Sequence, residues 1–480
     1  MLRLHNGVIN YYACIFFQNF VKLFLFFFLI ILVIITFYTL FNKNFYNKKL
    51  FYITYANFFL ISFFLIFFIL KIFFLSFKSN NFFFSNHTHM SLFIFSDSLI
   101  ILSILITLVS WVYLGERYLN KFNFSANYFV IFIFCTINMV YSSNLLTMFI
   151  YFELIFLPSL FFVYKLGYSK KVEKTISYLL IWTLTGSLLI LFCCIYIYSI
   201  TNTLNLNYLL SFNFSFEEKF ILSIFFFLGF GVKIPLWPFH YWLTKVHVEA
   251  PTGFSIFLSG FLVKTAFFCF SVVYIIFFNI TGSLIMLPII LWGCIDSSIR
   301  MWSASDIKRL IAFATIQEMN LILVFFLLTG NSRCKFISIF LILHGVLSAF
   351  LFYIVDLIQK NFHSRNITSL SGLSVVSGQL HFFIWVGILI FRGFPIFSKF
   401  IIEWEILSNF LTNFGLFGFL IFFLISFFGT IGFCRIWFNI LYGQPSNNVL
   451  NSITILKKDY YLGYLLLLII VFLNSYLLIL

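Results

Sequence analysis

The sequence predicts an all-α, polytopic membrane protein with about fourteen transmembrane helices. Of its 480 residues, 62% are hydrophobic and 9% carry a charge, whereas about a quarter of the residues in soluble domains are charged. The apolar residues form runs of about 20 residues, the length that a helix needs to cross a bilayer. The connections between the runs are mostly short and leave no room for a catalytic domain outside the membrane. These observations exclude a soluble globular protein and a disordered chain.

The apolar runs can be placed along the chain in order. The first is about 25 residues long and has no small-residue cleavage site, so we expect a retained helix rather than a signal peptide. Residues 1–90 hold the first two runs, 91–279 the third to eighth, 280–442 the ninth to thirteenth, and 443–480 the fourteenth. The centres of the runs fall near residues 28, 63, 102, 134, 155, 188, 232, 266, 291, 317, 346, 393, 427 and 470.

The basic residues between the runs predict an orientation. Loops on the cytoplasmic or matrix side of a membrane carry the excess of Lys and Arg. The odd-numbered connections carry 17 basic residues and the even-numbered ones carry 4, which places both termini on the opposite, outer side. The net charge of +15 does not indicate a nucleic-acid partner, because the basic residues are spread among the apolar runs. The first set is Lys43, Lys48, Lys49, Arg117, Lys121, Lys165, Lys170, Lys171, Lys174, Lys245, Arg300, Lys308, Arg309, Lys360, Arg365, Lys457 and Lys458, and the second is Lys78, Lys219, Arg333 and Lys335.

Signals for metal binding or covalent chemistry are weak. His87 and His89 form a His-x-His step in a polar loop, but no carboxylate or thiol lies close to them in the sequence. The eight cysteines contain no Cys-x-x-Cys spacing and mostly lie inside apolar runs. No Gly-rich phosphate loop or nucleophile elbow is present either. We therefore expect no metal site.

A small group of ionisable residues lies inside the apolar runs. Inserting one charged side chain near the bilayer centre costs about 2.5–3.5 kcal/mol on the scale derived from helix-insertion experiments. We therefore expect each of these side chains to face a partner or water and to serve a function. The group consists of Lys233, Lys264, Arg392, Lys399, Arg435, Glu153, Glu318, Asp356, Glu403 and His344.

Two prolines predict interruptions in the seventh and twelfth spans. Pro235 follows Lys233 in the middle of the seventh span, and proline removes a helical hydrogen bond, so we expect free carbonyls near Phe230 and Gly231. Pro395 predicts the second interruption, eight residues before Glu403. The two breaks lie five spans apart, as expected if spans 4 to 8 and 9 to 13 are repeats of opposite orientation. The alternative for Lys233 is a snorkelling side chain beside a packing kink.

A buried lysine next to a carboxylate can act as a two-state device for protons. Burial disfavours the charged amine and a nearby carboxylate restores it. If Glu153 lies beside Lys233, a change in their separation would bind or release a proton. Lys264, His344 and Glu403 supply further titratable groups at similar depth, although His344 alone is equally well read as a histidine that serves only packing.

Several of these segments together resemble a known family. The stretches Val232-Lys233-Ile234-Pro235, Trp242-Leu243 and His247-Val248-Glu249-Ala250-Pro251 resemble the signature of the subunit 4 family of respiratory complex I, the mitochondrial NADH:ubiquinone oxidoreductase. The resemblance runs from about Asp97 to Arg435. Further similar segments are Phe152-Glu153 with Pro158, Leu262-Val263-Lys264, Asp306 to Ala312, His344-Gly345 and Pro395 to Glu403.

The resemblance implies an antiporter-like fold of fourteen helices, with inverted repeats and discontinuous helices 7 and 12. It also implies a proton relay. In that relay Glu153 resembles the glutamate that tunes the first lysine, Lys233 the central lysine, and Lys264 the bridging lysine. His344 resembles a histidine of the central axis and Glu403 the terminal carboxylate.

Two departures from the family concern the second half. Relatives often have Ser-His-Met where this chain has Gln317-Glu318-Met319, so Glu318 replaces an imidazole. Lys399 and Glu405 add charges near the second break and could pair with each other or with Glu403. Glu318 and Lys399 are therefore candidate additional members of the relay.

By resemblance, the chain is a multipass subunit of the mitochondrial inner membrane, with both termini on the intermembrane-space side. It would belong to the proton-translocating NADH:ubiquinone reductase and have no redox site or cofactor of its own. Other subunits would bind FMN, the iron–sulfur clusters and ubiquinone. Expected partners are neighbouring antiporter-like and supernumerary subunits and membrane lipids, with cardiolipin a candidate at the basic segment Lys165 to Lys174.

Three alternatives remain at this point. An Mrp-type cation/proton antiporter subunit would share the fold and the lysines. Another antiporter-like complex I subunit, 2 or 5, is also compatible, although subunit 5 normally carries a long C-terminal lateral helix. The third alternative is a structural membrane scaffold whose charges are packed pairs.

Overall fold

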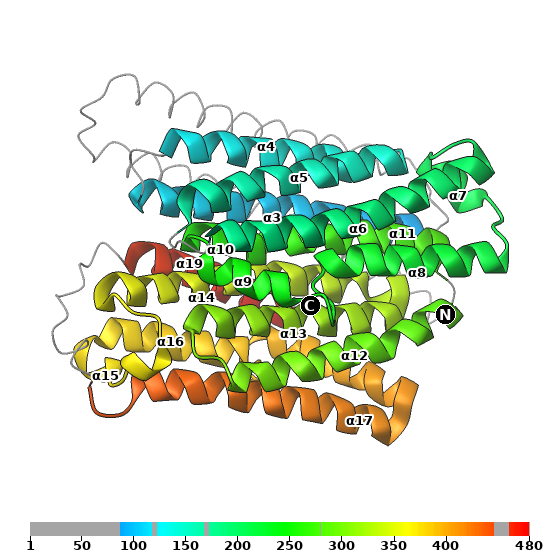
Figure 1. The fold of residues 1–480 in the computed structure, drawn as a ribbon. Coiled ribbons are helices and arrows are strands. Elements are labelled where there is room, and N and C mark those ends of the chain that lie inside the picture. The colour runs from blue at the N-terminus through cyan, green and yellow to red at the C-terminus, as the bar shows by residue number, and fades with distance from the viewer. Residues whose placement is uncertain (1–86, 118–121, 168–171, 279, 446–459, 480) are drawn as a thin grey trace. The chain divides into compact units, whose positions relative to one another are not determined.

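A computed structural model describes residues 87–117, 122–167, 172–278, 280–445 and 460–479, and the regular elements in these ranges are helices (Figure 1). Seven of the described helices are long and apolar enough to cross a membrane. The fold is therefore all-α and polytopic, as the composition predicts.

The helices follow one another with short connections. In chain order they are α3 (His87–Arg117), α4 (Phe122–Val140), α5 (Leu145–Leu166), α6 (Val172–Thr201), α7 (Leu206–Ser211), α8 (Phe216–Lys233), α9 (Tyr241–Glu249), α10 (Thr252–Phe257), the π-helix η2 (Leu258–Leu262), α11 (Val263–Phe277), α12 (Ile280–Trp302), α13 (Ile307–Thr329), the short 3₁₀ helix η3 (Gly330–Arg333), α14 (Cys334–Phe362), the 3₁₀ helix η4 (Ile367–Ser369), α15 (Leu373–Val376), α16 (Gly378–Phe391), α17 (Ser398–Leu441) and α19 (Tyr461–Ile479).

These helices account for the twelve predicted apolar runs from residue 102 onward. The runs centred near residues 28 and 63 lie outside the described residues. One expectation is wrong: His87 and His89 lie in the first turn of α3 rather than in a loop.

Helix α17 covers the second part of the run centred near residue 393 and the run centred near residue 427. At 1.5 Å per residue its 44 residues would span about 66 Å as one rod, roughly twice the thickness of a hydrocarbon core. Gly415 interrupts it with φ 59° and ψ −143°, so the chain forms two helices in succession. A positive φ favours glycine, which has no Cβ to clash with the backbone.

The described chain forms two compact units. Among the described residues the first contains parts of α3 and α4 within Thr107–Ile133. The second contains Thr88–Ile106 and Phe134–Leu480, and it holds all the candidate site residues.

The interior of the second unit is built from α10, η2, α11, α13 and α14. Every residue in the apolar window of α13 is buried, whereas only 17% of the corresponding window of α17 is buried. Helix α6 also exposes apolar residues at helical spacing, namely Ile181, Leu184, Leu188, Phe192 and Ile195. Large exposed apolar surfaces of this kind are typical of lipid or partner contact.

The first predicted helix break is present between α8 and α9. Helix α8 ends at Lys233, and residues 234–240 lead to Tyr241 without helical structure. The expectation of free carbonyls at Phe230 and Gly231 is wrong, because their oxygens accept from the amides of Ile234 and Leu236, each at 2.8 Å. The chain turns tightly enough to keep these buried groups paired, as buried backbone groups require.

The carbonyl released by this break belongs to Val232. It accepts a hydrogen bond from the indole Nε1 of Trp242 at 2.9 Å. The first turn of α9 therefore caps the last turn of α8 and holds the two half-helices together around Pro235.

The second predicted break lies between α16 and α17, around Pro395. Here the carbonyl of Phe391 accepts from the side-chain amine of Lys399. Gly393 has φ 61°, and a Cβ at this position would overlap the carboxyl group of Glu403. Glycine is therefore required at position 393 for two reasons: the positive φ of the backbone and the close approach of a carboxylate.

Candidate functional site

The first cluster of the candidate site is an ion pair at the α8 break. The amine of Lys233 contacts the carboxylate of Glu153 from α5. Lys233 is completely buried, and 25% of the Glu153 side chain is exposed. Because Lys233 occupies the last turn of α8, the negative end of the helix dipole also favours its charge.

Aromatic rings complete the surroundings of Lys233. Its nitrogen lies 4.3 Å from the centroid of the Phe152 ring and 4.7 Å from that of Phe156. Such cation–π contacts partly replace hydration of a desolvated ammonium. The lysine is thus held by one carboxylate and two ring faces, so separating it from Glu153 would leave a poorly compensated buried charge.

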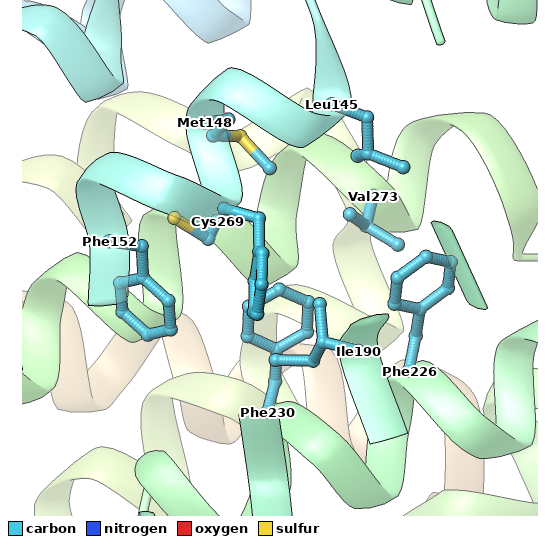
Figure 2. Close-up of a pocket in the computed structure, with 9 residues that line it drawn as sticks. Leu145, Met148, Phe152, Ile190, Phe226, Phe230, Cys269 and Val273 are labelled. Carbon is cyan, nitrogen blue, oxygen red and sulfur yellow. The ribbon is translucent and has the colours of Figure 1, made fainter. Parts of the chain in front are cut away.

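A small apolar cavity lies next to this pair. Phe152 and Phe230 line it together with the side chains of Leu145, Met148, Phe149, Ile190, Phe226, Cys269 and Val273 (Figure 2). It has room for about one water molecule. Its lining is apolar, so it offers no polar partners to hold a water molecule.

Lys264 forms the second cluster, at the π-helix. Its buried amine donates to the main-chain carbonyl of Ser259, which lies within η2. A π-helix leaves a carbonyl without its usual helical partner, and the lysine takes that place. Among the described residues, no carboxylate lies within ion-pair distance of Lys264.

Two serines connect this position to α14. The hydroxyl of Ser259 lies 3.2 Å from that of Ser348, which in turn donates to the carbonyl of Gly345 at 3.0 Å. The helices approach closely here, because a Cβ at Gly345 would lie 2.9 Å from the carbonyl oxygen of Gly260. The hydroxyls bridge two helix backbones that small residues bring together.

His344 lies directly before Gly345 in α14. The residue is buried, and in the described part of the chain its Nε2 atom has no hydrogen-bond partner. Its ring stacks on Phe340, with 6.2 Å between the centroids. The arrangement leaves one ring nitrogen of His344 available for a proton or a water molecule.

The third cluster joins α13 and α17. The amine of Lys399 lies 2.7 Å from Oε1 of Glu318 and 3.5 Å from Oε1 of Glu403. Lys399 and Glu318 are both buried, with side-chain exposures of 6% and 4%. The shorter contact of Lys399 is with Glu318, a pairing that the sequence did not predict, and the longer one is with Glu403, one of the two alternatives that the sequence left open.

Glu405 belongs to a different pair. Its Oε2 lies 3.3 Å from Nη1 of Arg333, whose side chain is 45% exposed. The pair sits at an accessible edge, where ion pairs contribute about 0–1 kcal/mol. Glu405 is therefore not placed at the centre of the second-half cluster.

The remaining charges inside the apolar runs have structural contacts. Asp356 accepts from the hydroxyl of Thr252 at 2.8 Å. The guanidinium of Arg392 lies over the Phe433 ring at 4.6 Å, and that of Arg435 over Trp302 at 5.3 Å.

Sequence reasoning missed three groups near the predicted site. Ser259 and Ser348 carry no sequence signal, because their contact depends on helix packing across 89 positions. Asp296 binds Arg300 at 2.7 Å and lies 3.4 Å from His240. Because Asp296 and Arg300 are four residues apart, their ion pair on one face of a helix could have been predicted from the sequence.

The predicted site residues thus fall into three groups. Glu153 lies with Lys233, and Glu318, Lys399 and Glu403 lie together. Lys264 binds a carbonyl of η2, and two serines join η2 to the carbonyl of Gly345, the residue that follows His344. Within the described residues, no hydrogen bond or ion pair joins one group directly to the next. A proton passing between groups would need water or side-chain movement.

A polytopic helical bundle with broken helices and buried lysine–carboxylate clusters is the architecture of antiporter-like membrane subunits. The family described as "NADH:quinone oxidoreductase/Mrp antiporter, TM" matches residues 142–429, and the chain belongs to this family. This span contains the three clusters.

Similar proteins include NADH-ubiquinone oxidoreductase chain 4 of Paramecium tetraurelia, 37% identical over 72% of this chain and 73% of that protein. The chain 4 protein of Acanthamoeba castellanii is 33% identical over 64% of this chain and 61% of its own length. The resemblance to chain 4 inferred from the motifs is confirmed by these relatives.

Solved structures share the fold. Respiratory complex I from Thermus thermophilus with bound NADH contains a chain with a TM-score of 0.69 and 19% identity, covering 79% of this chain and 81% of that chain. The Mrp complex from Dietzia sp. DQ12-45-1b contains a chain with a TM-score of 0.67 and 17% identity, covering 74% of this chain and 67% of that chain. At these identities the likeness establishes the antiporter-like fold.

Proposed function

We propose that this chain is a proton-translocating subunit of the membrane arm of respiratory complex I in the mitochondrial inner membrane. The observation that carries the proposal is the buried contact between Lys233 and Glu153 at a helix break. The names of the relatives from Paramecium and Acanthamoeba support the assignment to NADH-ubiquinone oxidoreductase.

The first step of the proposed mechanism is a change in the Glu153–Lys233 separation. With the carboxylate in contact, the ammonium is compensated and keeps its proton. With the carboxylate moved away, the buried amine is more stable uncharged and gives up a proton. The broken helix allows such movement, because α8 and α9 are joined by seven non-helical residues, 234–240, rather than by a continuous rod.

The released proton is then passed towards the second half of the chain. Lys264 is the next amine, and Ser259 with Ser348 provides hydroxyls that can both donate and accept on the way to His344. Glu403, with Glu318 and Lys399, ends the series in α17 and α13. Water completes the steps between the clusters.

The chain carries no redox cofactor in this proposal. FMN, iron–sulfur clusters and ubiquinone are bound by other subunits. The free energy of NADH oxidation is transmitted to this chain by electrostatic coupling between neighbouring antiporter-like subunits. Further partners are supernumerary subunits and membrane lipids, with cardiolipin at the basic segment from Lys165 to Lys174. Both termini face the intermembrane space, as the Lys and Arg distribution indicates.

The experiment that tests this function is proton pumping by the assembled complex in sealed vesicles. Lys233→Ala should lower the rate of NADH-driven proton pumping by about tenfold or more, because a positioned proton-transfer group contributes roughly 10²–10⁴-fold to the rate. Lys245→Ala is the matched control: Lys245 lies in the next half-helix and packs over the ring of Tyr178 at 3.5 Å. Unchanged pumping in an assembled Lys233→Ala complex would refute the relay.

The Mrp complex structure supports a second candidate, a cation/proton antiporter subunit, because it shares the fold. Purification of the native complex separates the two. Flavin and iron–sulfur subunits that co-purify with this chain support complex I, and their absence from an active, intact assembly supports the antiporter.

A further inference from the structure

Lys399 differs from Lys233 and Lys264 in having two carboxylates within reach. Its nitrogen lies 2.7 Å from Glu318, on α13, and 3.5 Å from Glu403, one turn further along its own helix. Lys233, by comparison, contacts Glu153. The second-half cluster therefore has one more carboxylate than the first-half pair.

Other charged groups surround this cluster. The positive charge of Arg392 acts on both Glu318 and Glu403, and its buried Nε atom has no hydrogen-bond partner among the described residues. On the α16 side, the guanidinium of Arg392 lies over Phe433, and its Nη2 is 3.7 Å from the sulfur of Met301. Glu405 pairs with Arg333, and His344 is the titratable ring on α14. Among the described residues, Lys399 is the one cation that lies within ion-pair distance of Glu318 and Glu403.

The position of Lys399 in its helix makes it depend on these acceptors. It lies in the first turn of α17, where the positive end of the helix dipole disfavours a cation. The carbonyl of Phe391 accepts from its amine, and the Phe391 ring lies 4.3 Å from the nitrogen. This contact to the backbone can hold the ammonium while its remaining N–H groups turn between the carboxylates.

The surroundings of the two carboxylates restrict where they can lie. Glu403 packs against Gly393, whose missing Cβ makes room for the carboxyl group. Glu318 is held in the middle of α13, which is buried along its length. The lysine, with its flexible stem, is the part of the cluster that can change partner without movement of a helix.

We propose that Lys399 is a two-position switch whose ammonium exchanges between Glu318 and Glu403 during proton transfer. When a proton reaches Glu403, an O–H bond forms, the carboxyl becomes neutral, and the ammonium pairs with Glu318. When that O–H bond breaks and the proton passes to water, the ammonium returns towards Glu403. Lys399 keeps its own proton throughout, so it acts as a positioning residue, in contrast to Lys233.

This inference rests on the proposed proton-translocating function and assigns a role to Glu318, the carboxylate that stands where the family resemblance implies a histidine. Glu318 would serve as the resting partner of the ammonium whenever Glu403 is protonated. A histidine at that position could not supply a permanent negative charge.

The decisive variant is Lys399→Arg in the assembled complex. Arginine keeps the charge, and its planar fork can bind both carboxylates at once, so the cluster remains paired but can no longer exchange partners. We expect the rate of NADH-driven proton pumping to fall by about tenfold or more. We also expect redox-driven infrared difference spectra to lose the band of a protonated carboxylic acid. Arg333→Lys, a matched exchange in the Arg333–Glu405 pair, should leave both readouts unchanged.

A second variant covers the case in which Arg does not fit. Replacing both members of the closer pair, Glu318→Leu with Lys399→Met, removes the charges together and keeps an apolar, packed core. If Lys399 acts as a switch, the double variant loses proton flux. If the Lys399–Glu318 pair has only a structural role, the double variant keeps its proton flux. Normal flux in either variant overturns the inference. Lys233→Ala, measured in parallel, shows separately whether the chain translocates protons at all.

Discussion

The amine of Lys264 donates a hydrogen bond to the main-chain carbonyl of Ser259, five residues earlier in the chain. This contact is made inside the π-helix that joins α10 to α11, where the widened turn frees a carbonyl. The same serine uses its hydroxyl to reach Ser348 on α14. One local irregularity therefore anchors a buried amine and, through the Ser259 hydroxyl, links the π-helix to α14. The same hydroxyl also lies 2.9 Å from the carbonyl oxygen of Ser255.

The connection through the serines can be tested with Ser348→Ala. The substitution removes one hydroxyl from the path, and a lost hydrogen bond of about 1 kcal/mol corresponds to roughly a fivefold slower proton transfer. The measurement is proton pumping by the assembled complex. Ser338→Ala is the control, because Ser338 is also buried in α14 and also donates to the carbonyl three residues before it. Equal pumping by the two variants would exclude a role for Ser348.

Gly393→Ala should damage the second helix break. An alanine at φ 61° costs about 1–2 kcal/mol, and its Cβ would displace the carboxyl group of Glu403. We expect a less heat-stable complex and slower pumping. Gly378→Ala, at the start of α16, provides the control because its Cβ would meet no atom within 4 Å among the described residues. A Gly393→Ala complex that matches this control in both measurements would contradict the role of the close approach.

Trp242→Phe should loosen the first helix break. The carbonyl of Val232 would lose the indole donor, and an unpaired buried acceptor costs about 1–3 kcal/mol. We expect faster hydrogen exchange of the amides in the last turn of α8 and the first turn of α9. The control is Trp404→Phe, since Trp404 is 61% exposed on α17, away from this break. Identical exchange in the two variants would show that the indole bond does not hold the break together.

The membrane architecture could be predicted from the sequence because it depends on composition. Long apolar runs without charges have few alternatives to transmembrane helices. The two breaks were predictable for the same reason: Pro235 and Pro395 cannot donate to a helix at these positions. The interruption of α17 at Gly415 was harder to predict, because glycine is frequent inside membrane helices. Only the positive φ of Gly415 in the structure shows that α17 consists of two helices.

The detailed site could be predicted only in part. Charges inside apolar runs drew attention to Lys399 and Glu318, but not to their contact, which joins residues 81 positions apart. The free carbonyls expected at the first break are paired, because the backbone turns back on itself after Lys233. The π-helix at Ser259 has no sequence signature, and it decides where the amine of Lys264 points.

The central claim is that Glu153 and Lys233 act together as a device that binds and releases protons. A double-mutant cycle on proton flux tests it most directly, using Glu153→Ala, Lys233→Ala and the double variant in the assembled complex. The account predicts that each single variant loses flux and that the double variant is no worse than Lys233→Ala, because both residues serve one step. Recovery of normal proton flux in the double variant would contradict the account, because it would show that the pair serves only to compensate charge in the membrane.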